Sequence, residues 1–220
     1  WAHSFFSGVV VAPLFAAGNA LFLSQFSTDW LPHAYIASAG MGIGTAWLYS
    51  RARKRLTTAS LFRGLLLSLL VCVLALRLAF GLTEAAWPAF VLLGLYSVTN
   101  ALLSVEVWGL AGQLFTVRQG KRLFGLVGSG ELMAMAIGGL ATPMLVSWLG
   151  TENLLLIAAG GLGGCLACLA CLAIISREHS GRLSRRAGGE AESVSSSLFS
   201  LAKHRYTLWI FLLAVVGVSA

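Results

Sequence analysis

Long apolar runs separated by short polar connections dominate the first 176 residues of the sequence. A helix that crosses a membrane needs about 20 mostly apolar residues, and six runs approach or exceed that length. We therefore predict six complete transmembrane helices, the second from the shortest run and the fourth from the longest. The six runs are Phe5–Phe26, Ala34–Ser50, Leu61–Leu82, Trp87–Phe115, Leu123–Leu149 and Leu154–Ser176.

The pattern changes after the sixth run. Residues 177–205 are polar and basic and include Gly188-Gly189 and a run of serines, which predicts a flexible linker loop. A further apolar run covers residues 206–220, and we interpret it as the start of a seventh helix in a longer protein, with an interfacial segment as the alternative. The predicted organisation is a six-helix bundle at 1–176, a linker at 177–205 and the start of a seventh helix at 206–220.

Composition agrees with an all-α integral membrane protein. Apolar residues make up 58% of the chain and charged residues 10%, and the mean hydropathy is +0.85. Soluble domains usually contain about 25% charged residues. We therefore expect the lipid bilayer, rather than water, to surround most of this protein.

The cationic residues follow an alternating pattern along the chain. Fourteen of the fifteen Lys and Arg residues lie after the second, fourth and sixth runs, whereas the other connections contain Asp29, Glu84 and Glu152 and no cation. Because cytoplasmic loops are enriched in Lys and Arg, the pattern predicts a cytoplasmic N-terminus. We interpret the net charge of +7 as a topology signal facing anionic lipid, not as a nucleic-acid site.

Two carboxylates lie inside apolar runs, where an ionisable group is costly and indicates a site. Glu106 is about 18 Å along its helix from Arg118, and Glu131 is about 13–14 Å along its helix from Arg122. Both are therefore expected in the cytoplasmic half, facing one cavity as proton or cation carriers or as ligands for a substrate cation. The alternative is that each accepts hydrogen bonds from neighbouring helices and only holds the bundle together.

Four other polar residues in the apolar runs are candidates for substrate contact. Arg77 lies near the outer end of the third run, where it either extends to the interface or contacts an anion at the outer side of a cavity, paired with a carboxylate. Asn19, Asn100 and Gln113 either join helices by hydrogen bonds or contact the substrate.

Small residues predict where helices pack. Gly40-x-x-x-Gly44 and Gly160-x-x-x-Gly164 have the spacing that lets two membrane helices approach closely. We expect these four glycines to lie at helix contacts.

The cysteines and histidines do not predict an enzyme, a metal site or a cofactor. Cys165, Cys168 and Cys171 share one helix face among Leu and Ala, and we interpret them as small apolar side chains. The histidines are expected at membrane edges or in loops, without a nucleophile beside them. They are His3, His33, His179 and His204.

A block around the fourth and fifth runs resembles the ATP/ADP translocases of plastids and intracellular bacteria, the nucleotide transporter branch of the major facilitator superfamily. The resemblance is strongest over residues 106–139, and six helices followed by a basic loop are also the layout of that superfamily. The matching residues are Trp108, Gly109, Ala111, Gln113, Thr116, Lys121, Arg122, Phe124, Gly128 and Gly130.

The resemblance implies a multi-pass protein of a bacterial inner membrane, with two six-helix halves that enclose a substrate near the midplane. It implies a nucleotide as substrate and a cytoplasmic gating loop formed by Arg118, Lys121 and Arg122. Bacterial relatives can also carry a soluble regulatory domain after the membrane part. The family moves nucleotides with lysines inside its helices, and no Lys lies within the six runs of this chain.

Two functions therefore remain open. The first is a secondary transporter that works by alternating access, with a nucleotide or another organic anion as substrate. The second is a non-transporting membrane sensor or scaffold that retains the transporter fold, which the scarcity of intramembrane cations favours.

Overall fold

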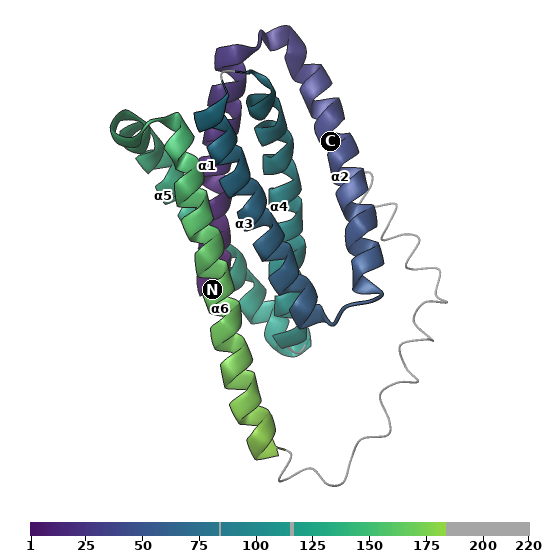
Figure 1. Cartoon of the computed structure of the whole chain (residues 1–220). Helices are drawn as coiled ribbons and strands as arrows, with labels where there is room; N and C mark the ends of the chain where they lie inside the picture. The colour runs from purple at the N-terminus through teal and green to yellow at the C-terminus, as the bar shows by residue number, and fades with distance from the viewer. Residues whose placement is uncertain (84, 115–116, 184–220) are drawn as a thin grey trace. The chain divides into compact units, whose positions relative to one another are not determined.

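The computed structural model describes residues 1–83, 85–114 and 117–183, without the side chains of 113–114, 117–119, 121–122 and 175–183. Residues 1–172 form one compact unit. Within the described residues the structure is helical throughout, with consecutive long helices running in opposite directions (Figure 1). The long helices are α1 (Ala2–Gln25), α2 (Leu31–Arg53), α3 (Thr58–Leu82), α4 (Trp87–Leu114), α5 (Val117–Leu149) and α6 (Leu154–Leu183), with short 3₁₀ turns η1 (Thr28–Trp30) and η2 (Thr151–Asn153).

Five segments of these helices are long and apolar enough to cross a membrane, which indicates a multi-pass membrane protein. Helices suit this role because every backbone polar group inside a helix is satisfied within the segment. Helix α2 has 23 residues but is not among the five segments, so a sixth span at 34–50 stays a prediction. The five segments are Ala2–Gln25, Thr58–Leu82, Trp87–Gly112, Leu123–Leu149 and Thr151–Ile174.

Several helix boundaries differ from the sequence pattern by a few residues, three of them at helix ends that bear on the site or the linker. Helix α1 begins at Ala2 rather than Phe5, and α5 begins at Val117 rather than Leu123. Helix α6 continues to Leu183 and so includes the first residues of the predicted linker. A helix of 33 residues such as α5 is about 50 Å long, more than the roughly 30 Å of hydrocarbon, so polar residues can extend it outside the membrane. The rest of the linker and residues 206–220 lie outside the described part of the chain.

The bundle has two ends of opposite charge. The turn between α2 and α3 and the start of α5 carry most of the cationic residues that precede α6, and we call this the basic end. The η1 and η2 turns carry Asp29 and Glu152 at the other end, which we call the acidic end. Helices α1, α3 and α5 run from the basic end to the acidic end (Figure 1).

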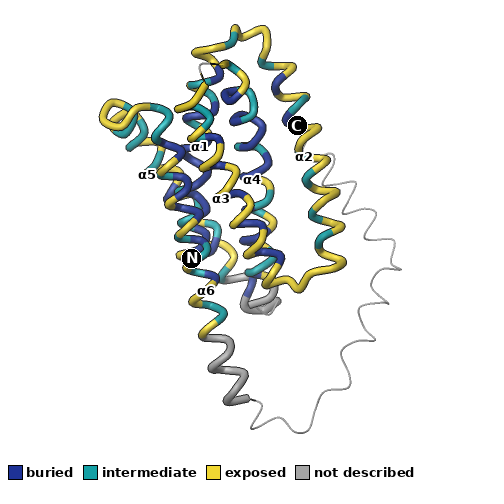
Figure 2. The backbone as a smooth tube through the Cα atoms, in the orientation of Figure 1, coloured by how far each residue is buried: buried dark blue, intermediate teal, exposed yellow. Residues whose placement is uncertain are grey.

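Buried side chains gather where α1, α3, α4 and α6 meet. The core includes Leu14 from α1, Leu66 from α3, Leu92 from α4 and Leu162 from α6, all fully buried. Helices α2 and α5 expose most of their surface (Figure 2), and α2 buries only Ala34 and Ser38. The core therefore centres on α1 and α4, which carry the candidate site described below.

Helix α1 crosses α5 along a line of small residues spaced four apart on both helices. A methyl group added at Gly8 would lie 2.5 Å from the carbonyl oxygen of Glu131, closer than real atoms pack. Such residues let two membrane helices bring their backbones together. This α1–α5 seam consists of Ser4, Gly8 and Ala12 on α1 and of Gly130, Ala134 and Gly138 on α5.

The two glycine pairs predicted from the sequence to lie at helix contacts do not belong to this seam. At Gly164 a methyl group would collide with the ring of Phe6, so a close contact is confirmed there. At Gly40, Gly44 and Gly160 it would meet no described atom within 4 Å, so the described residues show no close helix contact at these three positions. The spacing of glycines predicts a helix face without side chains, but it does not predict which helix packs against that face.

Candidate functional site

The first turn of α1 lies against α4 and brings a histidine to a buried carboxylate. Nε2 of His3 is 3.5 Å from Oε1 of Glu106, and the two side chains are 10% and 0% exposed. A charge-assisted hydrogen bond is usually about 2.7–2.9 Å long, so the pair is in ion-pair contact without a tight hydrogen bond. The structure thus places Glu106, a predicted site residue, in the core with an ionisable partner.

Several buried polar atoms around this pair lack hydrogen-bond partners in the described part of the chain. Both carboxylate oxygens of Glu106 and both ring nitrogens of His3 belong to this set, as do the hydroxyls of Ser4, Ser7 and Thr99. Most buried polar groups in proteins are hydrogen-bonded, and each exception calls for an explanation.

The buried hydroxyls extend the site into the bundle. Ser7 lies one turn after His3 on the same face of α1, and Thr99 lies two turns before Glu106 on the same face of α4. Because the two helices are antiparallel, both hydroxyls lie on the side of the pair toward the acidic end. Beyond Thr99 the core along α1 and α4 is apolar and includes Leu14 and Leu92. The buried polar groups therefore extend from the basic end into the bundle only as far as Thr99.

A cavity of about 410 Å³ opens beside the pair, between the first turn of α1 and residues of α4, α5 and α6. This volume lies within the range of small-molecule sites. Its walls are mostly apolar, with polar groups from His3, Ser4 and two cysteines. Its lining includes His3, Phe6, Leu110, Val127, Cys168 and Leu172.

The cysteine face of α6 packs toward this site. Cys165 is buried and its thiol donates to the carbonyl oxygen of His3 at 3.8 Å. Cys168 and Cys171 line the cavity. Within the described residues, no group of three His, Cys, Asp or Glu side chains has the arrangement of a metal site.

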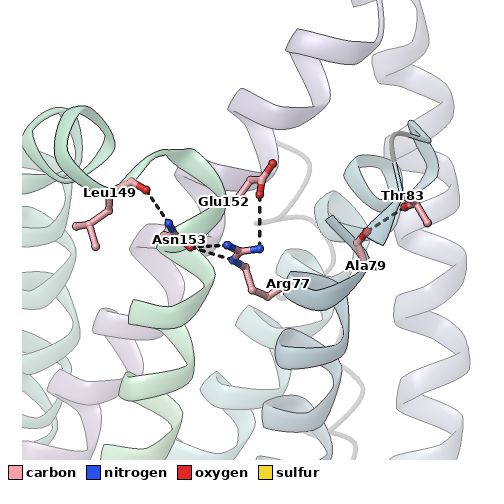
Figure 3. Close-up of polar contacts among 6 residues, drawn as sticks. All are labelled: Arg77, Ala79, Thr83, Leu149, Glu152 and Asn153. Carbon is pink, nitrogen blue, oxygen red and sulfur yellow. Dashed lines mark hydrogen bonds and ion pairs between the residues drawn. The ribbon is translucent and has the colours of Figure 1, made fainter. Parts of the chain in front are cut away.

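Arg77 makes a separate polar cluster at the acidic end (Figure 3). Its Nε and Nη2 donate to Oδ1 of Asn153 at 3.0 and 2.7 Å, and Nη1 lies 3.5 Å from a carboxylate oxygen of Glu152. Asn153 in turn donates to the carbonyl oxygen of Leu149 at 2.7 Å. We call Arg77, Glu152 and Asn153 the α3–η2 latch, because they connect α3 to the turn before α6.

The other predicted candidates do not join Glu106. Asn19 donates to the carbonyl oxygen of Phe15 one turn earlier in α1, at 2.9 Å. Asn100 and Glu131 are half-buried, and in the described part of the chain neither side chain makes a hydrogen bond or ion pair. Glu131 lies beside the α1–α5 seam, and no contact joins its carboxylate to that of Glu106.

Four candidates have undescribed side chains. The backbone of Gln113 is in the last turn of α4, and Arg118, Lys121 and Arg122 are in the first turns of α5. The three cations therefore lie at the start of a helix, not in a free loop. They mark the same end of the bundle as His3.

His3, Ser7 and Thr99 were missed by the sequence interpretation, which placed His3 at a membrane edge. The signal was present in the spacing. His3 and Ser7 are four residues apart, and Thr99 and Glu106 are seven apart, so each pair shares a helix face. Two polar stripes on helices that must pack together predict a buried polar site.

Comparison of the chain with protein-family models, curated proteins and solved structures finds no match.

Proposed function

We propose that this protein is a secondary transporter that works by alternating access, with Glu106 and His3 as its coupling pair. The observation that carries the proposal is the fully buried Glu106 carboxylate, which faces His3 and lacks a hydrogen bond in the described part of the chain. Burying an ionised carboxylate costs several kcal/mol unless it is well paired. Incomplete pairing of this kind suits a carboxyl group that gains and loses a proton during a transport cycle.

The arrangement of polar groups supports access from one side at a time. The cavity and the His3–Glu106 pair lie toward the basic end, and the core beyond Thr99 is apolar. A proton or ion could therefore reach Glu106 from the basic end while the apolar layer closes the other side. Alternating access requires such a closed layer on one side of the site.

The orientation, the bundle type and the membrane are proposed from the sequence. We place the basic end in the cytoplasm because of the alternating cations, and we assign a major-facilitator-type bundle of a bacterial inner membrane because of the resemblance over residues 106–139. That block contains Glu106 and the start of α5. Within it, Arg118, Lys121 and Arg122 supply cations for an anionic substrate at the same end as the cavity.

A nucleotide or another organic anion is the proposed substrate. The cavity of about 410 Å³ suits part of such a molecule, although among the described residues of its lining His3 has the one basic side chain. A triphosphate is bound best by several cations. A singly charged organic anion therefore fits the described side chains better than ATP does.

The test is exchange across proteoliposomes that contain the complete protein. Vesicles loaded with unlabelled nucleotide are given labelled ATP or ADP, and a second set is given labelled organic anions under an imposed pH gradient. Saturable uptake that Glu106→Gln abolishes, while Glu152→Gln retains it, is the expected result. Glu152→Gln is the matched control because it removes one carboxylate at the opposite end.

Three other results of the uptake experiment would change the proposed function. Full uptake by Glu106→Gln would remove the coupling role from that residue. Uptake of organic anions without nucleotide exchange would retain the transporter and reject the nucleotide. Ligand binding by folded protein without any uptake would instead identify the sensor or scaffold.

A further inference from the structure

The turn between α2 and α3 concentrates positive charge on a short segment of the chain. The backbone N–H groups of Arg55 and Leu56 both donate to the carbonyl oxygen of Ala52, at 3.0 and 2.9 Å, which closes the turn tightly. No Asp or Glu occurs in the sequence between Asp29 and Glu84. Four exposed cations therefore stand together without a carboxylate from their own helices. They are Arg51, Arg53, Lys54 and Arg55.

An exposed tryptophan marks the level of this turn relative to a membrane. Trp47 is 64% exposed, and the guanidinium of Arg51 lies over its ring at 5.7 Å from the centroid. Tryptophan is enriched at the boundary between headgroups and hydrocarbon. Arg51 and the turn that follows therefore lie at the depth of lipid phosphates.

Two apolar hollows lie directly below the cationic turn. One of about 200 Å³ lies between α2 and α3, and one of about 140 Å³ lies between α2 and α4. They share Thr45, Tyr49 and Leu102, so they are adjacent parts of one groove. The remaining lining is mainly apolar and includes Leu48, Leu56, Leu61, Leu65, Val98 and Val105.

We propose that this α2–α3 groove binds one anionic glycerophospholipid from the leaflet at the basic end. The phosphate and any further headgroup charge contact Arg51, Arg53, Lys54 and Arg55, and an acyl chain occupies the groove below them. Basic pockets between transmembrane helices are a known form of site for anionic lipid headgroups. The cations and the groove thus match the two ends of one amphiphilic molecule.

The length of the groove agrees with an acyl chain. Along α2, Gly42 at its inner end is 11 residues from Arg53, or about 16 Å. Along α3, Ser68 is about 15 Å from the first residue, Thr58. Half of the hydrocarbon core is about 15 Å thick. A free phosphate would use the cations alone and leave the apolar groove without a role, so we assign the site to a lipid.

Weak packing of α2 within the described unit is a second reason to expect a lipid here. Helix α2 buries only Ala34 and Ser38, both in its first half. A methyl group at Gly42 or at Gly64 on α3 would meet no described atom within 4 Å, and both glycines line the groove. An acyl chain would fill this space and join the second half of α2 to α3 and α4.

The experiment is native mass spectrometry of the purified full-length protein, delipidated and then titrated with phosphatidylglycerol or phosphatidylcholine. We expect one phosphatidylglycerol to bind at least tenfold more tightly than phosphatidylcholine. Each cation close to an anionic headgroup strengthens the binding roughly fivefold. Arg51→Gln with Arg53→Gln should therefore weaken phosphatidylglycerol binding about 25-fold, whereas the charge-matched Arg185→Gln with Arg186→Gln should leave it unchanged.

A second pair of variants tests the groove independently of charge. Gly64→Leu places a side chain in the groove and should weaken binding at least tenfold. Gly163→Leu, on α6 and equally open, should have no effect. Circular dichroism confirms that each variant is folded. Equal binding of both lipids would overturn the proposal. Unchanged phosphatidylglycerol binding by Gly64→Leu would also overturn it. The lipid would then not occupy the groove, which another part of this chain or a second copy would fill.

Discussion

His3 and Glu106 face each other inside the bundle, with Nε2 of the imidazole 3.5 Å from Oε1 of the carboxylate. The contact joins the first turn of α1 to α4, and it lies beside a cavity of about 410 Å³. Neither side chain completes a hydrogen bond in the described part of the chain. The contact therefore brings two ionisable side chains together in the core without a tight hydrogen bond.

The first prediction separates the function of the His3–Glu106 pair from its effect on stability. Replacing both members of a buried ion pair with apolar residues of similar size is often neutral or stabilising by about 1–4 kcal/mol. We therefore expect the double variant His3→Leu with Glu106→Leu to unfold at the same temperature as the wild type or higher, while losing all uptake. Thermal unfolding in detergent and proteoliposome uptake measure the two properties. A loss of folding equal to the loss of uptake would show that the pair is structural.

The second prediction concerns the coupling between the two side chains. Removing one partner leaves the other buried without compensation, which costs about 1–3 kcal/mol for a polar group. We expect His3→Ala to destabilise the protein by this amount, and to cost much less when Glu106 is already Leu. Residues in contact show such non-additivity in double-mutant cycles. Strict additivity of the two substitutions would contradict the contact.

The charge pattern predicted that the cationic connections share one end of the bundle, and in the described residues the turn between α2 and α3 and the start of α5 lie at the same end. It could not predict helix rotation. Both faces of these helices are apolar, so periodicity does not tell the core side from the lipid side. Glu106 and Glu131 looked equivalent in the sequence, yet Glu106 is fully buried and Glu131 is half-buried. His3 was missed because the apolar run begins at Phe5, whereas the helix begins at Ala2.

A third prediction tests the α1–α5 seam. In an open helical position, replacing Gly with Ala stabilises by roughly 0.5–1 kcal/mol. At Gly8 the new methyl group would collide with the backbone of α5, so we expect Gly8→Ala to destabilise by about 1–3 kcal/mol. Gly139→Ala is the matched control, since Gly139 has open space around it. Thermal unfolding of the two variants should shift in opposite directions, and equal shifts would refute the close crossing.

A fourth prediction ranks the contacts of the α3–η2 latch. Asn153 accepts two hydrogen bonds from Arg77 and donates one to Leu149, whereas the Glu152 side chain is 45% exposed. An exposed ion pair contributes about 0–1 kcal/mol and is screened by salt. We expect Asn153→Ala to cost more than 1 kcal/mol and Glu152→Gln less than 0.5 kcal/mol. The reverse order in thermal unfolding would show that the ion pair dominates.

The last prediction asks whether water reaches the cavity. Cys168 lines it, whereas Cys165 is buried behind it and donates to the His3 carbonyl oxygen. Thiols react as thiolates and need solvent. In single-cysteine variants, a charged maleimide should therefore label Cys168 at least tenfold faster than Cys165. Cys72 is exposed on α3, and we expect it to face lipid and to stay unlabelled until the protein is denatured.

A change in cavity size provides the control for this labelling. Ala167 lines the cavity, so Ala167→Leu should slow the labelling of Cys168. Ala170 is exposed on the same helix and is not part of the lining, so Ala170→Leu should leave the rate unchanged. Labelling of Cys165 as fast as Cys168 would mean that the reagent arrives by another route. An unreactive Cys168 that reacts fully after denaturation would mean that the cavity is closed to water, which would contradict the proposed access to Glu106 from the basic end.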